Sequence, residues 1–143
     1  MYEFLDYRVQ DVMSKPVSIG PETPLAEVER ILEERGFNAL PVVDAAERVI
    51  GIVSSLDLLR AFSFPEDEIL PPLHRALLLP VSDVLTRDVL TVTPRTPLTR
   101  VLEKLVTTGN RSLPVVEDER LVGVVARRDV MQALRRADAQ EQA

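Results

Sequence analysis

The sequence predicts a mixed α/β (α+β) fold made of two β-α-β-β-α motifs related by pseudo-twofold symmetry. Residues 9–62 and 81–134 align with 20 identities in 53 pairs, allowing one extra residue at Leu90 and one at Glu47. In each copy an apolar stripe at helical spacing precedes two β-branched runs. Two copies of a half-domain-sized unit indicate one domain over residues 1–143, because each half alone would bury too little surface.

Each copy is expected to begin with a short strand and an amphipathic helix. The strands are expected at Val17 to Ile19 and at Val89 to Val92. In the first copy Thr23-Pro24 precedes the helix and Gly36 follows it, and the second copy repeats this pattern from Thr96 to Gly109. We expect threonine to be the N-cap, proline the first helical residue and glycine the left-handed exit.

A hairpin and a second helix complete each copy, and the family resemblance described below implies that each motif forms a three-stranded sheet packed with its two helices. We expect strands at 39–43, 49–53, 112–116 and 121–125, turns at 44–48 and 117–119, and helices at 55–62 and 127–137. The linker at 63–80, rich in proline and leucine, should be semi-rigid. The polar tail at 136–143 should fray.

Charge and composition narrow the function classes. The chain has 23 acidic and 17 basic residues, a net charge of -6, no tryptophan and only 4% aromatic residues, which disfavours binding to nucleic acid. Its apolar runs are too short to span a bilayer, so no membrane partner is expected. The absence of cysteine fits a reducing compartment, and the cytoplasm is the expected location.

Residues typical of a catalytic centre are not grouped in this sequence. His74 is the single histidine, and its place in the linker predicts a surface residue rather than a metal ligand or a catalytic base. The five glycines form neither a P-loop nor a dinucleotide-binding turn. We therefore expect neither catalytic nor metal-binding residues, and a small nucleotide hydrolase remains only a distant alternative.

The strongest motif follows each hairpin. Gly51-Ile-Val-Ser-Ser-Leu-Asp57, preceded by Asn38-Ala-Leu-Pro-Val-Val-Asp44, resembles the C-terminal half of a CBS motif, the repeat named from cystathionine β-synthase. Gly123-Val-Val-Ala-Arg-Arg-Asp129, preceded by Arg111-Ser-Leu-Pro-Val-Val116, is its tandem partner. The chain thus resembles a stand-alone CBS pair, or Bateman module, over nearly its whole length.

This resemblance implies two clefts between the motifs that bind adenosine ligands, and pairing of modules into homodimers. The family's ribose-binding aspartate corresponds to Asp57 and Asp129, and its hydroxyl residue to Ser54 alone, because Ala126 stands at that place in the second copy. The two clefts should therefore bind unequally. The remaining candidate ligand contacts are Val17, Ser18, Asn38 and Ile52 in the first copy and Leu90, Arg111, Arg127 and Arg128 in the second.

The residue chemistry is compatible with this assignment. A carboxylate such as Asp57 offers acceptors only, so two vicinal ribose hydroxyls can both donate to it. The free N–H groups at a helix start would suit a phosphate or a carboxylate. Arg127, Arg128 and Arg111 could add bidentate phosphate contacts, which would make the second cleft the more basic one.

Each candidate also has a purely structural interpretation. Ser54 and Asp57 have the spacing of a capping box, and the helix dipole alone would favour Asp129. Asn38 could be a turn residue. The three arginine candidates could lie on a solvated face: Arg111, Arg127 and Arg128. The three apolar candidates could belong to the core: Ile52, Val17 and Leu90.

The sequence thus predicts a non-catalytic sensor of AMP, ADP or ATP that requires no cofactor, with S-adenosyl compounds and NAD as further possible ligands. A ligand would act by shifting the population of conformations, and an unknown effector protein would read the change. The alternative is an assembly module with empty or degenerate clefts. A homodimer is expected because four apolar residues of the second helices should be exposed: Leu58, Leu59, Val130 and Met131.

Overall fold

The computed structural model describes residues 2–63 and 73–142, and the part of the expected linker at 64–72 lies outside the described residues. The chain divides into two compact units. Unit 1 comprises Met1–Pro16 and Leu90–Ala143, and unit 2 comprises Val17–Val89. The units differ from the sequence repeats, because the first segment of each repeat folds with the hairpin of the other.

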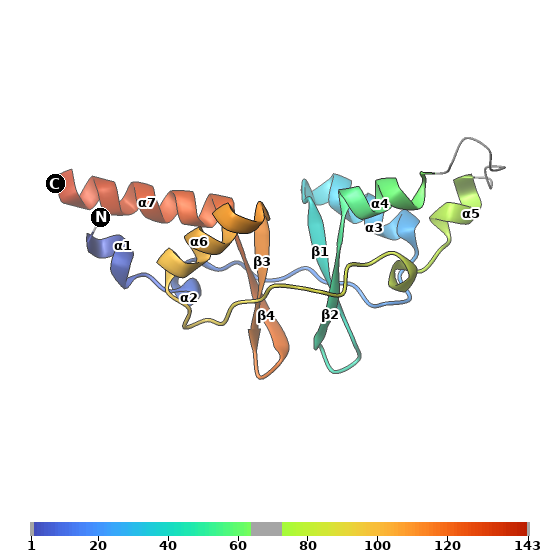
Figure 1. The fold of residues 1–143 in the computed structure, drawn as a ribbon, viewed down its shortest axis with the longest axis horizontal. Coiled ribbons are helices and arrows are strands. Elements are labelled where there is room, and N and C mark those ends of the chain that lie inside the picture. The colour runs from blue at the N-terminus through green and yellow to red at the C-terminus, as the bar shows by residue number, and fades with distance from the viewer. Residues whose placement is uncertain (1, 64–72, 143) are drawn as a thin grey trace. The chain divides into compact units, whose positions relative to one another are not determined.

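The two units contain corresponding elements (Figure 1). Unit 1 contains α1 (Tyr2–Asp6), α2 (Val9–Val12), α6 (Leu98–Thr108), β3 (Ser112–Glu117), β4 (Arg120–Ala126) and α7 (Arg127–Gln142). Unit 2 contains α3 (Leu25–Arg35), β1 (Ala39–Val43), β2 (Val49–Ser54), α4 (Ser55–Ala61), α5 (Leu73–Leu77) and the 3-10 helix η1 (Val81–Asp83). The predicted order of helices and hairpins in each repeat is therefore confirmed.

Each sheet is a two-stranded antiparallel hairpin, so three-stranded sheets are not confirmed. The expected first strands are reduced to single parallel bridges, Ile19 to Val42 and Val92 to Val115. Proline explains why the first bridge does not extend toward Val17. Ile19 N donates to Pro41 O at 3.2 Å and Val43 N donates to Ile19 O at 2.9 Å, but the next bond would need an N–H that Pro41 lacks. Pro114 holds the same position beside Val92.

The other edge of each hairpin pairs with a segment exchanged between the repeats. We call these the exchanged segments: residues 81–89 contact β2, and residues 9–16 contact β4. In unit 2, Thr86 N donates to Ile52 O at 2.8 Å and Ile52 N donates to Thr86 O at 2.9 Å. In unit 1, Ser14 N donates to Val124 O at 2.9 Å and Val124 N donates to Ser14 O at 3.0 Å. These reciprocal pairs are antiparallel bridges that attach each exchanged segment to β2 or β4.

Residues just before the exchanged segments contact the start of the first helix of each unit, and the predicted threonine N-caps and first-position prolines are wrong. Leu25 N at the start of α3 donates to Leu79 O at 2.9 Å, and Leu98 N at the start of α6 donates to Tyr7 O at 3.0 Å. Pro24 and Pro97 occupy the N-cap positions in extended conformation, without a side-chain cap. A backbone carbonyl from a distant segment thus replaces the hydroxyl that local sequence suggested.

The predicted turns and helix exits are confirmed. Gly36 and Gly109 end α3 and α6 with left-handed φ values of 64° and 74°. In the β1–β2 turn, Asp44 accepts hydrogen bonds from Arg48 N at 3.0 Å and Ala46 N at 2.9 Å, and these bonds lower the pKa of its carboxyl group. Glu47, which follows in that turn, has a φ of 64°.

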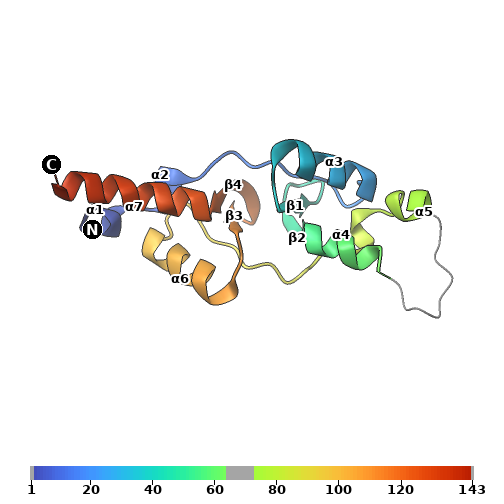
Figure 2. The same ribbon diagram turned by 90° about the horizontal axis from the view of Figure 1, so that it is seen from above.

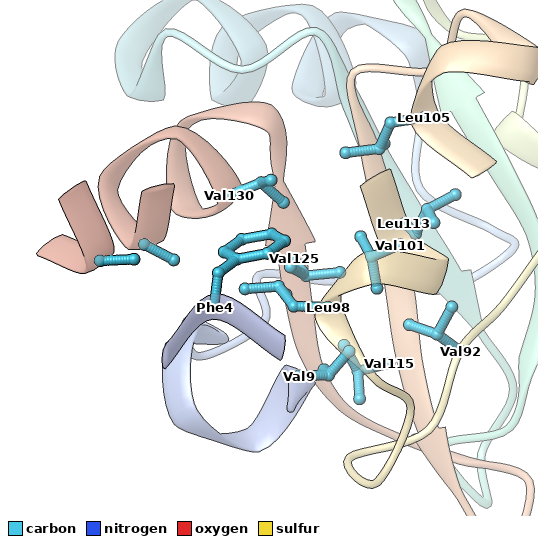
Figure 3. Close-up of a cluster of buried hydrophobic side chains, with 12 residues drawn as sticks. Phe4, Val9, Val92, Leu98, Val101, Leu105, Leu113, Val115, Val125 and Val130 are labelled. Atoms are coloured by element: carbon cyan, nitrogen blue, oxygen red, sulfur yellow. The ribbon is translucent and has the colours of Figure 1, made fainter. Parts of the chain in front are cut away.

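Helices cover one face of each hairpin. Both views place α6 and α7 on the same face of β3–β4, with α1 alongside α7 (Figure 2). Phe4 of α1 lies buried in the core of unit 1 with residues of α6, α7 and both strands (Figure 3). Ala133 and Ala137 on α7 are buried in this cluster, and the helix continues to Gln142. The expected fraying from residue 136 is therefore wrong, because α7 is helical to Gln142 and Ala137 packs with Phe4 of α1 in the core.

The second helices expose fewer apolar residues than expected. Leu58 and Val130 are buried in the cores of their units, because each lies on the helix face that packs against its hairpin. Leu59 and Met131, one position further along, are 66% and 52% exposed. Leu56 on α4 is also exposed.

We expect Gly51→Ala to lower the free energy of unfolding by about 1–3 kcal/mol, since a small residue is needed where the exchanged segment crosses β2. A Cβ at Gly51 would lie 2.8 Å from Thr86 O, a backbone atom of the bridge. Gly20→Ala is the matched control, because nothing lies within 4 Å of its added Cβ. Urea unfolding monitored by circular dichroism measures the free energy of unfolding of both variants. Equal stabilities would contradict the proposed role of Gly51.

Candidate functional site

The candidate site residues lie around two equivalent junctions. At each junction the second strand of a hairpin passes directly into a helix. Ser54 ends β2 immediately before α4, and Ala126 ends β4 immediately before α7. Asp57 and Asp129 stand at the third position of these helices. They are 6% and 9% exposed and are the two buried charged side chains in the described part of the chain. Burial of a carboxylate requires hydrogen bonds or charge partners, so their contacts decide what each can do.

Both oxygens of the Asp57 carboxylate accept hydrogen bonds. Oδ2 accepts from Ser54 N at 2.8 Å and from Ser54 Oγ at 3.0 Å, while Oδ1 accepts from Thr86 Oγ1 at 3.2 Å. Asp57 N donates to Ser54 Oγ at 3.2 Å, which completes a capping box. Arg60 Nη1 lies 3.9 Å from Oδ1, but its exposed side chain adds little to a pair of this length. The capping-box interpretation of Ser54 and Asp57 is therefore confirmed.

The Asp129 carboxylate is less fully satisfied. Oδ2 accepts from Ala126 N at 2.7 Å, as the corresponding oxygen of Asp57 does from Ser54 N. Ala126 has no hydroxyl, and Ser14, which occupies the place of Thr86, makes no side-chain bond to Asp129. Among residues 2–63 and 73–142, no donor reaches Asp129 Oδ1.

The other candidates of the first repeat all lie in unit 2. Asn38 is exposed, and its carbonyl oxygen accepts from Ser55 N at 3.0 Å, which places it beside the start of α4. Ile52 is half-buried on the face of β2 that it shares with Ser54. Val17 is half-buried and packs against the core of unit 2, whereas Ser18 is exposed. Val17 thus has the core role that was its structural alternative.

The candidates of the second repeat all lie in unit 1. Arg111 O accepts from Arg127 N at 3.0 Å, which places Arg111 beside the start of α7. The Arg127 guanidinium donates to Gly109 O at 2.6 Å and to Asn110 O at 3.1 Å, so it closes the corner after α6. The side chains of Arg111 and Arg128 are exposed. Leu90 is half-buried against the core of unit 1.

Thr86 is a site residue that the sequence interpretation missed. Its hydroxyl reaches Asp57 although the two residues are 29 positions apart. A signal was present, because the repeats align Ser14-Lys15 with Thr86-Arg87, so a hydroxyl and a cation recur at the same place in both copies. Exchange of the segments brings each pair to the hairpin of the other repeat.

Two other classes of site find no support in the described residues. Across 2–63 and 73–142, histidine, cysteine and carboxylate side chains form no group of three that could hold a metal ion. A search of the same residues finds no helix with the length and apolar character needed to span a bilayer.

Comparison with known proteins identifies the family. The CBS domain model matches residues 9–63 and 81–136, and the chain therefore belongs to the CBS domain family as a tandem pair. The chain is 30% identical over 134 residues to the A-adding tRNA nucleotidyltransferase of Aquifex aeolicus, covering 93% of this chain but only 15% of that enzyme. The similarity to this relative is thus confined to a small part of the enzyme.

Solved structures share the fold. The crystal structure of CBSX2 in complex with AMP is 29% identical, has a TM-score of 0.78 and covers 92% of this chain and 98% of that one. The CBS domain pair of protein MJ0100 in complex with 5'-methylthioadenosine and S-adenosyl-L-methionine is 26% identical, with a TM-score of 0.72 and the same coverages of 92% and 98%.

The capping geometry predicts opposite effects of two matched substitutions. Ser54→Ala should lower the free energy of unfolding by about 0.5–2 kcal/mol, because Asp57 N loses its acceptor. Ala126→Ser should raise it by about 0.5–1 kcal/mol, because a hydroxyl there can accept from Asp129 N as Ser54 Oγ does from Asp57 N.

Ser55→Ala is the control for both changes, because Ser55 is the exposed first residue of α4. Urea unfolding of the three variants and the parent measures the differences. Loss of stability in Ala126→Ser would show that the second helix start cannot accept the capping geometry of the first.

Proposed function

We propose that this protein is a non-catalytic regulatory module that senses adenine nucleotides or related adenosyl ligands through its two CBS motifs. The main support is the recurrence of a buried carboxylate at the helix start after each hairpin, at Asp57 and Asp129. The bound AMP, S-adenosyl-L-methionine and 5'-methylthioadenosine of the two solved CBS pairs all contain adenine joined to a ribose with free 2'- and 3'-hydroxyls. AMP, ADP and ATP are the first expected ligands, and NAD is a further one.

The chemistry of recognition follows from the carboxylate. A ribose offers two neighbouring hydroxyl donors, and a carboxylate oxygen without an internal donor can accept from them. Asn38, Ser18 and Ile52 in unit 2 and Arg111 and Arg128 in unit 1 are proposed as further contacts. No step of this recognition needs a bound metal or a cofactor.

In this proposal, a ligand signals by stabilising one arrangement of the two motifs more than another. A ligand shifts an equilibrium only by its differential affinity for the two states, so contacts with both motifs would be needed to change their arrangement. A separate effector protein would read the change. The enzyme relative supports regulation rather than catalysis, because this chain corresponds to 15% of its length. The cytoplasmic location stays a prediction.

An assembly module is the second candidate function, and two observations favour it. Internal donors already occupy both oxygens of Asp57. Leu56, Leu59 and Met131 expose large apolar side chains on α4 and α7. A homodimer through these second helices is therefore proposed under either function.

Thermal unfolding with AMP, ADP, ATP, NAD and S-adenosyl-L-methionine tests ligand sensing. A ligand at 100 times its dissociation constant should stabilise the protein by about 2.7 kcal/mol, because it binds the folded state alone. Guanosine monophosphate is the matched control for AMP. If no adenosyl compound raises the melting temperature, the assembly function is favoured.

Light scattering after size-exclusion chromatography tests the homodimer. At micromolar concentration the parent should have the mass of a dimer, and Met131→Glu should shift it toward a monomer by placing a charge in the apolar contact. Val106→Glu on α6 is the control, since it makes the same type of change at an exposed residue of another helix. A monomeric parent would contradict the proposal.

A further inference from the structure

We infer that two copies of this chain associate with unlike units in contact, so that α7 of unit 1 packs against α4 of unit 2 in the partner copy. This inference rests on the homodimer proposed above and specifies which surfaces form it. A twofold interface permits such a contact, because residue i of one copy then contacts residue j of the other copy, and the reverse. The support is a difference in side-chain chemistry between the two second helices.

The helix α4 exposes two large apolar side chains on one face. Leu56 and Leu59 are 52% and 66% exposed, and residues three positions apart are neighbours on a helix surface. Ser63, which follows Leu59 by four positions just beyond the helix, is exposed and uncharged. Arg60, the basic residue of α4, lies 3.9 Å from the Asp57 carboxylate. This helix therefore offers an apolar contact surface with little net charge.

The corresponding face of α7 combines an apolar side chain with a cation. Met131 aligns with Leu59 and is 52% exposed. Arg135 follows Met131 by four positions, is exposed, and aligns with the uncharged Ser63. Within residues 2–63 and 73–142, no carboxylate forms an ion pair with Arg135. Two α7 helices in contact would therefore bring like charges together, whereas contact with α4 would set Met131 against leucine without that repulsion.

The neighbouring helices favour the same choice (Figure 2). Beside α4 lies α3, in which Glu29 and Glu33 are exposed and form no ion pair within the described part of the chain. The helices α3 and α4 together carry three basic and five acidic residues, whereas α6 and α7 carry six and four. Charges of opposite sign attract across an interface, so the helices of unit 1 complement those of unit 2.

The charge difference extends to the whole units. The sequence of unit 1 contains eleven basic and ten acidic residues, whereas that of unit 2 contains six and thirteen. Contact between two copies of unit 2 would therefore bring two strongly acidic bodies together, and like-charge juxtaposition disfavours association. Contact between unlike units avoids this repulsion. The same charges predict that dimer affinity falls as salt screens the attraction.

Thiol cross-linking tests the contact directly, because the chain contains no cysteine of its own. Met131→Cys and Leu59→Cys are prepared separately, one of them with a tag that changes its mass. They are mixed, allowed to exchange subunits and treated with a short bismaleimide. We expect the covalent dimer to contain one copy of each variant, and each variant alone to yield at least tenfold less. Leu5→Cys, at a similarly exposed residue of α1, is the control and should cross-link with neither.

A charge substitution provides a second test that needs no cysteine. Arg135→Gln should raise the dissociation constant of the dimer several-fold in low salt, because the attraction to the acidic helices of unit 2 is lost. In about 1 M sodium chloride the effect should become less than twofold, because the charges are screened. Arg120→Gln, at the exposed start of β4, is the matched control and should leave the dissociation constant unchanged. Analytical ultracentrifugation measures all three proteins.

Three results would contradict the inference. Cross-linking of Met131→Cys alone, or of Leu59→Cys alone, as efficient as that of the mixture would show that like units are in contact, while the homodimer would stand. Tighter association of Arg135→Gln would show that this cation faces another cation. A monomeric parent in light scattering would overturn the proposed homodimer itself. The thermal unfolding test of ligand sensing is independent of all three results.

Discussion

The bridges between each exchanged segment and its hairpin are the interactions on which the rest of the structure depends. Reciprocal backbone bonds join Thr86 to Ile52 and Ser14 to Val124, at distances of 2.8 to 3.0 Å. Gly51 and Gly123 leave the room that these crossings need. Leu79 and Tyr7, just before these segments, supply the carbonyl groups that cap α3 and α6. Neither repeat can therefore complete its sheet edge or its first helix with its own residues alone, which makes the tandem pair the unit of folding.

These bridges also position the functional chemistry. Because Thr86 pairs with Ile52, its side chain stands beside the start of α4 and donates to Asp57. Ser14 pairs with Val124 in the same way, yet within residues 2–63 and 73–142 no donor reaches Oδ1 of Asp129. Two helix starts with the same backbone geometry thus differ in the internal donors that their carboxylates accept: three at Asp57 and, within the described residues, one at Asp129.

The N-terminal helix extends the core of unit 1. Phe4 is buried against α6, α7 and the strands, and Ala133 and Ala137 of α7 complete the same cluster (Figure 3). This packing holds α7 in place as far as Ala137, although residues 138–142 beyond it are exposed. In unit 2 the segment before η1 instead forms the short helix α5, with Ala76 buried. The two units therefore differ in the short helix that packs beside their longer helices, which is α1 in unit 1 and α5 in unit 2.

The sequence by itself determined the repeat, the order of helices and hairpins, the left-handed exits at Gly36 and Gly109, the family, and Asp57 and Asp129 as the residues to examine. These features depend on local spacing, which one chain displays directly. Only the tertiary structure decided that the first segments are exchanged, that carbonyl groups replace the threonine caps, that Leu58 and Val130 are buried, and which carboxylate oxygen stays available. Each of these depends on contacts between residues far apart in the chain, and short-range patterns carry no information about such contacts.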